Sequence, residues 1–155
     1  MFFSISMSAD ILNQSAHVTW DCTYHVVIVP KYRKKILFGQ VRRRAGEILR
    51  ELAKQKEVTV IQGNACPDHI HLIISIPPKY SVAHVMGFLK GKSAIRLHYE
   101  FGRKRKFMAN KSFWTRGYFV RTVGIDRARA EEYVRRQLEG DQREDENPQM
   151  EIQWE

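Results

Sequence analysis

The sequence predicts an α+β fold in which a split β-α-β arrangement builds an antiparallel sheet of the ferredoxin-like (RRM-like) type, with an extra C-terminal helix. Three observations lead to this prediction. The chain has 155 residues, enough for one domain with a buried core. Four stretches are rich in β-branched and aromatic residues, and three others carry helical signals. They follow one another as strand, helix, strand, strand, helix, strand and helix.

The first half of the chain predicts three strands and one helix. Residues 20–30 (WDCTYHVVIVP) are rich in β-branched and aromatic residues and end at a proline, so they predict the first strand. A helix follows, because apolar residues recur there at helical spacing: Val41, Ala45, Ile48, Leu49 and Leu52. Residues 57–66 and 69–76 predict the second and third strands, and Pro77 and Pro78 stop the third.

The second half predicts two more helices around a fourth strand. Ser81 can cap a helix that runs to about residue 99. Its buried face carries Val82, Val85, Met86 and Leu89. Residues 101–107 form a basic loop and residues 116–124 the fourth strand. Asp126 then caps a last helix that runs to about residue 138.

The third strand places two histidines on one face, within the stretch CPDHIHLIISIPP of residues 66–78. Side chains alternate along a strand, so Ile70, Leu72, Ile74 and Ile76 make an apolar face that must lie under the helices. His69 and His71 then lie about 6.6 Å apart on the open face, where nucleic acid often binds in an RRM. Imidazoles at this spacing can converge on one metal ion. The alternative is that they are ordinary polar residues of a half-exposed strand.

Cys66 and Asp68 flank this histidine pair. The spacing C-x-x-H-x-H is compatible with zinc, but a fourth ligand is not evident nearby, and we expect Cys66 to be a small core residue. Cys22 and Cys66 are far apart, which indicates reduced thiols and a cytoplasmic protein. Asp68 either orients a histidine by a hydrogen bond or caps the turn after Pro67. The other histidines have no evident partner and are interpreted as structural or surface residues: His17, His25, His84 and His98.

The charge of the chain is uneven. The net charge is +9, and residues 139–155 hold seven acids and one arginine, which leaves +15 on residues 1–138. We expect residues 1–138 to form a single domain and residues 139–155 an acidic, flexible tail. A body this basic indicates a polyanionic partner such as nucleic acid, although solubility alone would also explain it. No apolar run approaches the roughly 18 residues of a membrane span, and the N-terminus lacks the pattern of a signal peptide.

A phosphate-binding loop is suggested by GFLKGKS at residues 87–93 and is rejected. The stretch is one residue short of the P-loop pattern and lies inside a predicted helix instead of after a strand. Its basic residues, with Arg96, form either a face for DNA phosphates or an ordinary solvated helix face.

EEYVRRQ, at residues 131–137, places Tyr133 and Gln137 four residues apart, on one face of the last helix. Alone, such a tyrosine is usually a packing residue with a solvated hydroxyl. Combined with the histidine pair, Gln137 can offer its amide oxygen as a third metal ligand, and Tyr133 lies one turn away as a nucleophile.

Several blocks of the chain together resemble the HUH single-tyrosine transposases, the TnpA-type enzymes of the smallest bacterial insertion sequences. The blocks are TYHVVIVPKYRKKIL, DHIHLIISIPPKYSV, LKGKS, FWTRGYFVRTVG and YVRRQ, and they cover almost the whole chain in the family's order. The family's histidine–hydrophobe–histidine motif maps onto residues 69–71, its nucleophile onto Tyr133 and its glutamine ligand onto Gln137. The acidic tail is not part of the resemblance.

The resemblance implies cleavage and rejoining of single-stranded DNA, recognition of hairpins near the element ends, and a homodimer that exchanges the tyrosine helix, so that each active site is shared. Gly124 could be the pivot of that exchange. The implied cofactor is a divalent metal, Mg²⁺ or Mn²⁺, held by His69, His71 and Gln137; nitrogen ligands suit Mn²⁺ better. Residues expected to contact DNA are Lys31, Arg33, Lys34, Lys90, Lys92 and Arg121.

Three other interpretations remain open at this stage. The chain could be a domesticated relative that processes repeated hairpins without mobilising itself. It could be a non-catalytic RRM-like binder, which would use aromatic residues on the open face and would not need the histidine, tyrosine and glutamine set. The third is a zinc-dependent phosphodiesterase that uses Cys66.

Overall fold

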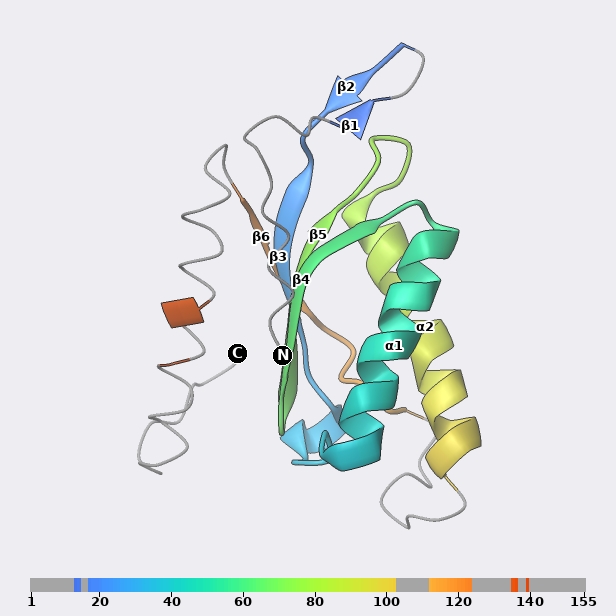
Figure 1. The fold of residues 1–155 in the computed structure, drawn as a ribbon. Helices are drawn as coiled ribbons and strands as arrows, with labels where there is room; N and C mark the ends of the chain where they lie inside the picture. The colour runs from blue at the N-terminus through green and yellow to red at the C-terminus, as the bar shows by residue number, and fades with distance from the viewer. Residues whose placement is uncertain (1–12, 15–16, 103–111, 124–134, 137–138, 140–155) are drawn as a thin grey trace. The chain divides into compact units, whose positions relative to one another are not determined.

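The computed structural model describes residues 13–14, 17–102, 112–123, 135–136 and 139. The chain divides into two compact units, Met1–Thr122 and Val123–Glu155. All the named elements belong to the first unit (Figure 1). In chain order they are β1 (Asn13–Gln14), β2 (Thr19–Trp20), β3 (Thr23–Ile28), the 3-10 helix η1 (Lys31–Arg33), α1 (Gly39–Gln55), β4 (Thr59–Cys66), β5 (His69–Ser75), α2 (Val82–Phe101) and β6 (Phe119–Thr122).

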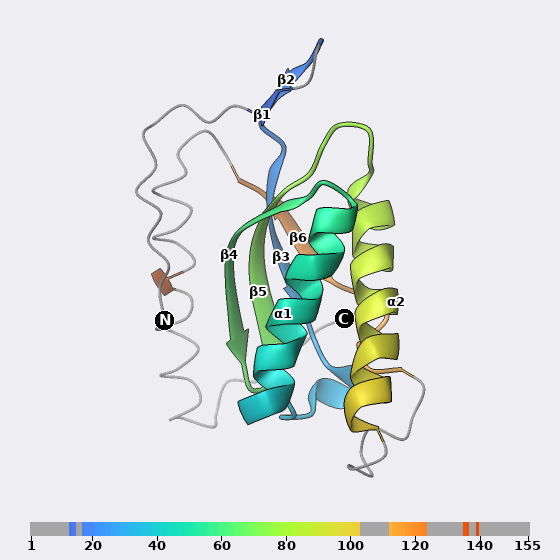
Figure 2. The same ribbon diagram turned by 45° about the vertical axis from the view of Figure 1, so that its right-hand side comes forward.

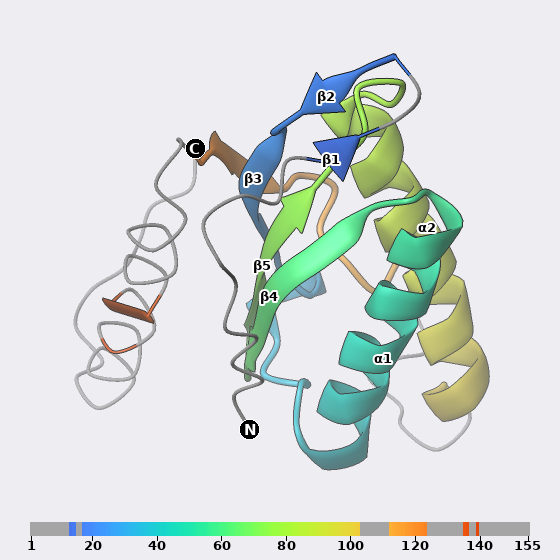
Figure 3. The same cartoon turned by 45° about the horizontal axis from the view of Figure 1, so that its top comes forward.

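The main sheet has four strands in the order β4-β5-β3-β6, and every neighbouring pair is antiparallel. Helices α1 and α2 lie side by side and cover one face of this sheet (Figures 1 and 2). With the top of the view tilted toward the reader, the two helices form one layer and the sheet another (Figure 3). The order β-α-β-β-α-β with this topology confirms the α+β, split β-α-β fold predicted from the sequence.

The two helices follow their sequence signals closely. All five apolar residues that predict α1 are buried. Ser81 is the N-cap of α2, as predicted. Its side chain accepts a hydrogen bond of 3.0 Å from the backbone N–H of His84. GFLKGKS lies within α2, so its glycines do not form a phosphate loop.

All four strands of the main sheet are shorter than predicted. β4 begins at Thr59 instead of residue 57, and β5 ends at Ser75 instead of residue 76. Trp20 lies outside β3, because it pairs with Asn13 in the separate β1–β2 hairpin. The fourth strand starts at Phe119 instead of residue 116. The carbonyl groups of Arg116 and Gly117 accept hydrogen bonds from the Lys90 amino group on α2, at 2.7 and 2.9 Å, so these two residues are tied to the helix layer.

The hydrophobic core lies between the sheet and the helices. The apolar face predicted for residues 69–76 contributes all four of its residues: Ile70, Leu72, Ile74 and Ile76. From the next strand, Val26 and Ile28 point the same way. Since cross-strand pairs put their side chains on one face, this packing places His69 and His71 on the opposite face of the sheet.

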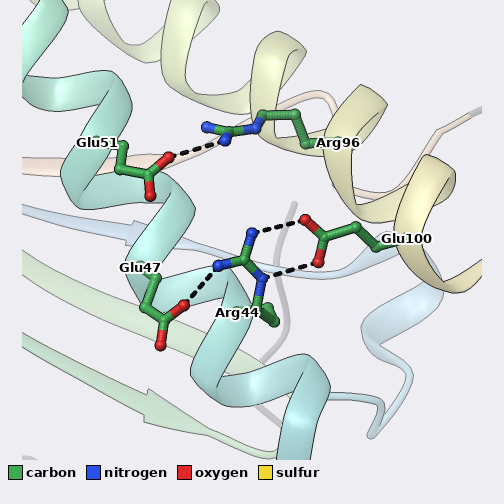
Figure 4. Close-up of polar contacts among 5 residues, drawn as sticks. All are labelled: Arg44, Glu47, Glu51, Arg96 and Glu100. Atoms are coloured by element: carbon green, nitrogen blue, oxygen red, sulfur yellow. Dashed lines mark hydrogen bonds and ion pairs between the residues drawn. The ribbon is translucent and has the colours of Figure 1, made fainter.

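Charged side chains join α1 to α2 on the outside of the helix layer (Figure 4). The Arg44 guanidinium donates two hydrogen bonds to the Glu100 carboxylate, at 2.8 and 2.6 Å, and a third to Glu47. Arg96 pairs with Glu51 at 2.8 Å. Arg96 therefore has a partner within the helix layer, which weakens its interpretation as part of a DNA-binding face.

Several predictions concern residues outside the described part of the chain: most of the basic loop at 101–107, the cap at Asp126, Tyr133, Gln137 and the acidic tail. In the second unit, Arg135, Arg136 and Glu139 have helical conformation. None of the helices in the described part of the chain combines the length and the apolar character that a bilayer crossing requires.

Candidate active site

The histidine motif lies at the start of a tight hairpin. β4 ends at Cys66 and β5 begins at His69, so only Pro67 and Asp68 make the turn. Cys66 pairs with His69 across the hairpin, and Asn64 pairs with His71. Paired residues direct their side chains to the same face. As a result, the ligand atoms of Cys66, His69 and His71 all lie within 4.8 Å of one another.

This geometry corrects the expectation for Cys66. The residue is half-buried, and its sulfur lies with the two imidazoles instead of in the hydrophobic core. The reason is the register: the tight turn aligns Cys66 opposite His69, on the face that points away from the helices.

The histidine face is also less open than the sequence predicts. His69 and His71 are 8% and 6% exposed, and Ile73 and Ser75 on the same face are buried too. β5 is a central strand flanked by β4 and β3, and on this face the His71 ring contacts the rings of His25 and His69. At the edge of the sheet, by contrast, all four residues of β6 are exposed.

Asp68 holds His69 through a short hydrogen bond. The distance from His69 Nδ1 to Asp68 Oδ1 is 2.5 Å, and the other carboxylate oxygen accepts from Arg33 Nε at 3.0 Å. The bond to His69, assisted by Arg33, lowers the pKa of Asp68 to about 2 against the effect of burial. Burial lowers the pKa of His69, but hydrogen bonds to Asp68 and Cys66 outweigh it and raise the pKa to about 10. With Nδ1 held by a carboxylate, Nε2 is the nitrogen of His69 suited to bind a metal.

His25 lies against this histidine pair, and sequence reasoning missed it. His25, His69 and His71 together are called the histidine cluster below. Its Nε2 lies 3.0 Å from Nδ1 of His71, and the two rings stack with centroids 5.2 Å apart. Burial, with the charges of His71 and Arg121, lowers the pKa of His25 to about 4. The expectation that His25 has no partner is wrong, because β3 pairs with β5 in a register that sets His25 opposite Ile73 and diagonal to His71. Only the strand pairing reveals this contact.

A basic segment follows β3, beside the histidine cluster. Lys31, Arg33 and Lys34 lie here, and Arg33 connects the segment to Asp68. Tyr32 stands between them with 70% of its surface exposed, and its backbone has φ of 62°, a left-handed conformation. The ammonium groups of Lys31 and Lys34 lie 5.4 and 5.8 Å from the centre of its ring. Exposed aromatic rings near cations are used by single-stranded nucleic-acid binding proteins to stack bases, and sequence reasoning overlooked Tyr32.

The other three residues expected to contact DNA lie elsewhere. Arg121 on β6 is exposed and pairs with His25 in the sheet, so it lies on the histidine face. Lys90 and Lys92 lie on α2, in the helix layer. Lys92 is exposed, whereas Lys90 is half-buried, which lowers its pKa, and it donates to backbone carbonyl groups. The structure thus separates the six residues into a group near the cluster and a pair on α2.

The donor set fits a divalent metal ion. Two imidazole nitrogens and one sulfur within 4.8 Å of one another are ligands that suit borderline transition metals better than Mg²⁺. The expected oxygen ligand, Gln137, and the expected nucleophile, Tyr133, lie outside the described residues, so their roles stay predictions.

The fold and the histidine motif together define an HUH-type domain: a ferredoxin-like sheet with H-x-H on a central strand, backed by two helices. Residues 18–137 match the family model described as "Transposase IS200 like". The chain belongs to the IS200-like transposase family, whose members cleave and transfer DNA strands.

Two curated relatives agree with this assignment. The transposase for insertion sequence element IS200 of Salmonella typhimurium is 46% identical over 126 residues, which cover 81% of this chain and 83% of the relative. The ISDra2 transposase TnpA of Deinococcus radiodurans is 31% identical over 115 residues, 74% of this chain and 82% of the relative.

Two solved structures share the fold. A crystal structure of a putative transposase from Deinococcus radiodurans R1 superposes with a TM-score of 0.66 and 26% identity, over 81% of this chain and 98% of that one. A REP-associated tyrosine transposase bound to a REP hairpin superposes with a TM-score of 0.54, over 78% of this chain and 68% of that one. At 12% identity, the second shows the fold alone.

Proposed function

We propose that this protein is a transposase that cleaves and rejoins single-stranded DNA at the ends of an insertion sequence, with Tyr133 as the nucleophile. The observation that carries the proposal is the family match over residues 18–137 together with the buried histidine pair that Asp68 and His25 hold in place. The 46% identity to an IS200 transposase supports a mobile element over a domesticated repeat-processing relative.

In this reaction the Tyr133 phenolic oxygen attacks a DNA phosphorus. A new oxygen–phosphorus bond forms, the bond from phosphorus to the 3′ oxygen breaks, and the departing oxygen takes up a proton. The products are a 5′-phosphotyrosine and a free 3′-hydroxyl. Because the phosphodiester is replaced by another phosphodiester, a later 3′-hydroxyl can reverse the step without an external energy source.

A tyrosine with an ordinary pKa of about 10 is a weak nucleophile at neutral pH. We propose that a divalent metal, Mg²⁺ or Mn²⁺, held by His69, His71 and Gln137, compensates for this weakness. When bound, it would withdraw electron density from the phosphate and make the phosphorus easier to attack. Asp68 accepts the Nδ1 proton of His69, which directs Nε2 to the ion, and Arg33 holds Asp68 in turn.

His25 has a matching role for His71. A neutral His25, with its pKa lowered to about 4, can accept a hydrogen bond at Nε2 from the Nδ1–H of His71. His71 then carries its lone pair on Nε2, as His69 does once a metal has displaced the proton that its raised pKa retains at neutral pH. Both imidazoles therefore take the tautomer that ligates through Nε2, one oriented by a carboxylate and the other by an imidazole.

DNA binding is assigned to the basic segment around Tyr32 and to Arg121, with Lys92 on the other layer. A net charge of +9 favours a polyanion, and a related fold is solved with a REP hairpin bound. We therefore propose folded single strands with hairpins as the substrate. We further propose a homodimer whose active sites combine the histidines of one subunit with Tyr133 of the other, acting on DNA in the cytoplasm.

The proposal is tested by detecting the covalent adduct between Tyr133 and DNA. Labelled single-stranded DNA from the ends of the element is incubated with the protein and Mn²⁺, and the products are separated on a denaturing gel. Tyr133→Phe should bind the hairpin but form no adduct, because only the attacking oxygen is removed. Tyr99→Phe is the matched control, since Tyr99 is the most exposed aromatic residue of α2. An adduct of undiminished yield from Tyr133→Phe would refute the assignment of Tyr133 as the nucleophile.

The metal requirement is tested in the same assay. His69→Ala and His71→Ala should abolish cleavage while hairpin affinity changes little, because the phosphate contacts of Lys and Arg supply most of the binding. EDTA should stop cleavage by the unmodified protein. Full activity in EDTA would remove the metal from the mechanism.

A further inference from the structure

We propose that Cys66, His69 and His71 form a three-ligand site that binds Zn²⁺ in preference to Mg²⁺, and that Zn²⁺ bound there arrests DNA cleavage. The arrest rests on the proposed function; the binding site does not. The starting point is that three ligand atoms of two neighbouring strands lie within 4.8 Å of one another.

The chemistry of these three groups favours zinc. Structural and catalytic zinc sites use cysteine sulfur and histidine nitrogen, at about 2.3 and 2.0 Å, and three protein ligands with one open position are a common catalytic set. From those bond lengths, neighbouring ligand atoms of a tetrahedral ion lie about 3.5 Å apart. Movement of about 1 Å by these side chains therefore closes the site, and Cys66, at the very end of β4, is half-buried and adjoins the turn.

The surroundings already orient two of the ligands. His69 is held by Asp68, which is held by Arg33, and His71 is held by His25. Histidines that bind zinc generally have a carboxylate or another hydrogen-bond acceptor at the ring nitrogen that does not bind the metal. The sulfur is an addition to the oxygen and nitrogen set that Mg²⁺ or Mn²⁺ would use, and it raises affinity selectively for softer ions.

Arrest follows from the same ligands. A thiolate transfers negative charge to the ion, which then withdraws less electron density from a phosphate. With three protein ligands, a tetrahedral ion also keeps a single open position. That position cannot accept both the Gln137 amide and a DNA oxygen. The zinc-bound protein should therefore hold the metal tightly and cleave poorly, while a six-coordinate Mn²⁺ without the sulfur supports the reaction.

The binding test uses metal-free, reduced full-length protein without DNA, titrated with Co²⁺ as a spectroscopic substitute for Zn²⁺. The unmodified protein should bind one ion per chain and show the near-ultraviolet charge-transfer absorption of a cobalt–thiolate bond. Cys66→Ser should lose this absorption. Cys22→Ser, which removes the other free cysteine, should keep it. Absence of the absorption from the unmodified protein, or its persistence in Cys66→Ser, would overturn the site.

Competition with Zn²⁺ then gives the affinity. Loss of an outer partner alone weakens metal binding about 10- to 100-fold, so loss of the sulfur should weaken Zn²⁺ binding by more than about 100-fold. Cys66→Ala is a second variant in case Cys66→Ser fails to fold, which thermal unfolding would reveal. Equal Zn²⁺ affinity in a folded Cys66 variant and the unmodified protein would contradict the proposal.

Inhibition is measured separately, as cleavage in Mn²⁺ with increasing Zn²⁺. Cys66→Ser should need at least about 100-fold more Zn²⁺ than the unmodified protein for half inhibition, in line with its weaker binding. Inhibition at the same Zn²⁺ concentration in both would refute the arrest. A protein that shows the cobalt–thiolate absorption but no cleavage in Mn²⁺ would instead refute the proposed function and leave the metal site established.

Discussion

Replacement of Asp68 should weaken metal binding by an amount that depends on what the new side chain still offers to His69. The carboxylate lies 2.5 Å from His69 Nδ1, and its side chain is 12% exposed, so water competes little for this bond. Asp68→Asn keeps a neutral acceptor and removes the charge, whereas Asp68→Ala removes both. Loss of such an outer partner costs about 10- to 100-fold in affinity, or about 1.4 to 2.8 kcal/mol. Compared at a pH where His69 is neutral in every protein, Asn should lie near the lower limit and Ala near the upper.

The assay is a calorimetric titration of metal-free protein with Mn²⁺, without DNA. Asp21→Asn is the matched control: Asp21 accepts a hydrogen bond from Thr23, which pairs with Ser75 at the end of β5 away from His69. The control should bind Mn²⁺ like the unmodified protein. If Asp68→Asn and Asp68→Ala both do so as well, the carboxylate does not orient His69 for metal binding and the reasoning is refuted.

The pH dependence of the same titration is a second check. The pKa of His69 is raised to about 10, so at neutral pH a metal must displace its proton. Mn²⁺ affinity should therefore increase as pH rises from 6.5 toward 10. In Asp68→Ala the raising hydrogen bond is lost, so this increase should be complete at lower pH. An affinity that does not change over this range would contradict the assignment of His69 as a ligand.

Three further predictions concern His25, Tyr32 and the sharing of active sites between subunits. The folded pKa of His25, about 4, lies below its ordinary 6.5, so the unfolded chain binds more protons between these values and stability falls as pH is lowered through them; in thermal unfolding His25→Gln should flatten this dependence, and the exposed-site control His84→Gln should not. Tyr32→Ala should weaken single-stranded DNA binding by about 1–3 kcal/mol, roughly 5- to 150-fold, through lost base stacking, measured by fluorescence anisotropy; an unchanged affinity would exclude stacking at this position. Finally, a mixture of His69→Ala and Tyr133→Phe proteins, each inactive alone, should recover cleavage in exchanged heterodimers if active sites are shared, whereas confirmed heterodimers without activity would show that each site is built within one chain.

The local elements of this protein are readable from the sequence because their signals are local. The alternation of residues 69–76 places the isoleucines against the helices and the histidines on the other face, and the structure confirms the packing of the apolar face. Ser81 caps α2 through a contact three residues away. The likeness of the motif blocks to a known family adds the roles of Tyr133 and Gln137, which residue spacing alone would leave as a packing tyrosine and a surface amide.

The neighbours of the histidine pair follow from the tertiary structure alone. His25 meets His71 across 46 residues of sequence, and Arg33 meets Asp68 across 35. Periodicity indicates which face of a strand a side chain occupies, but it does not indicate which strand lies alongside or in which register. That register depends on how the two helices and four strands pack together. The same pairing turns Cys66 toward the imidazoles and brings His25 against His71, on a face that alternation alone suggests is open.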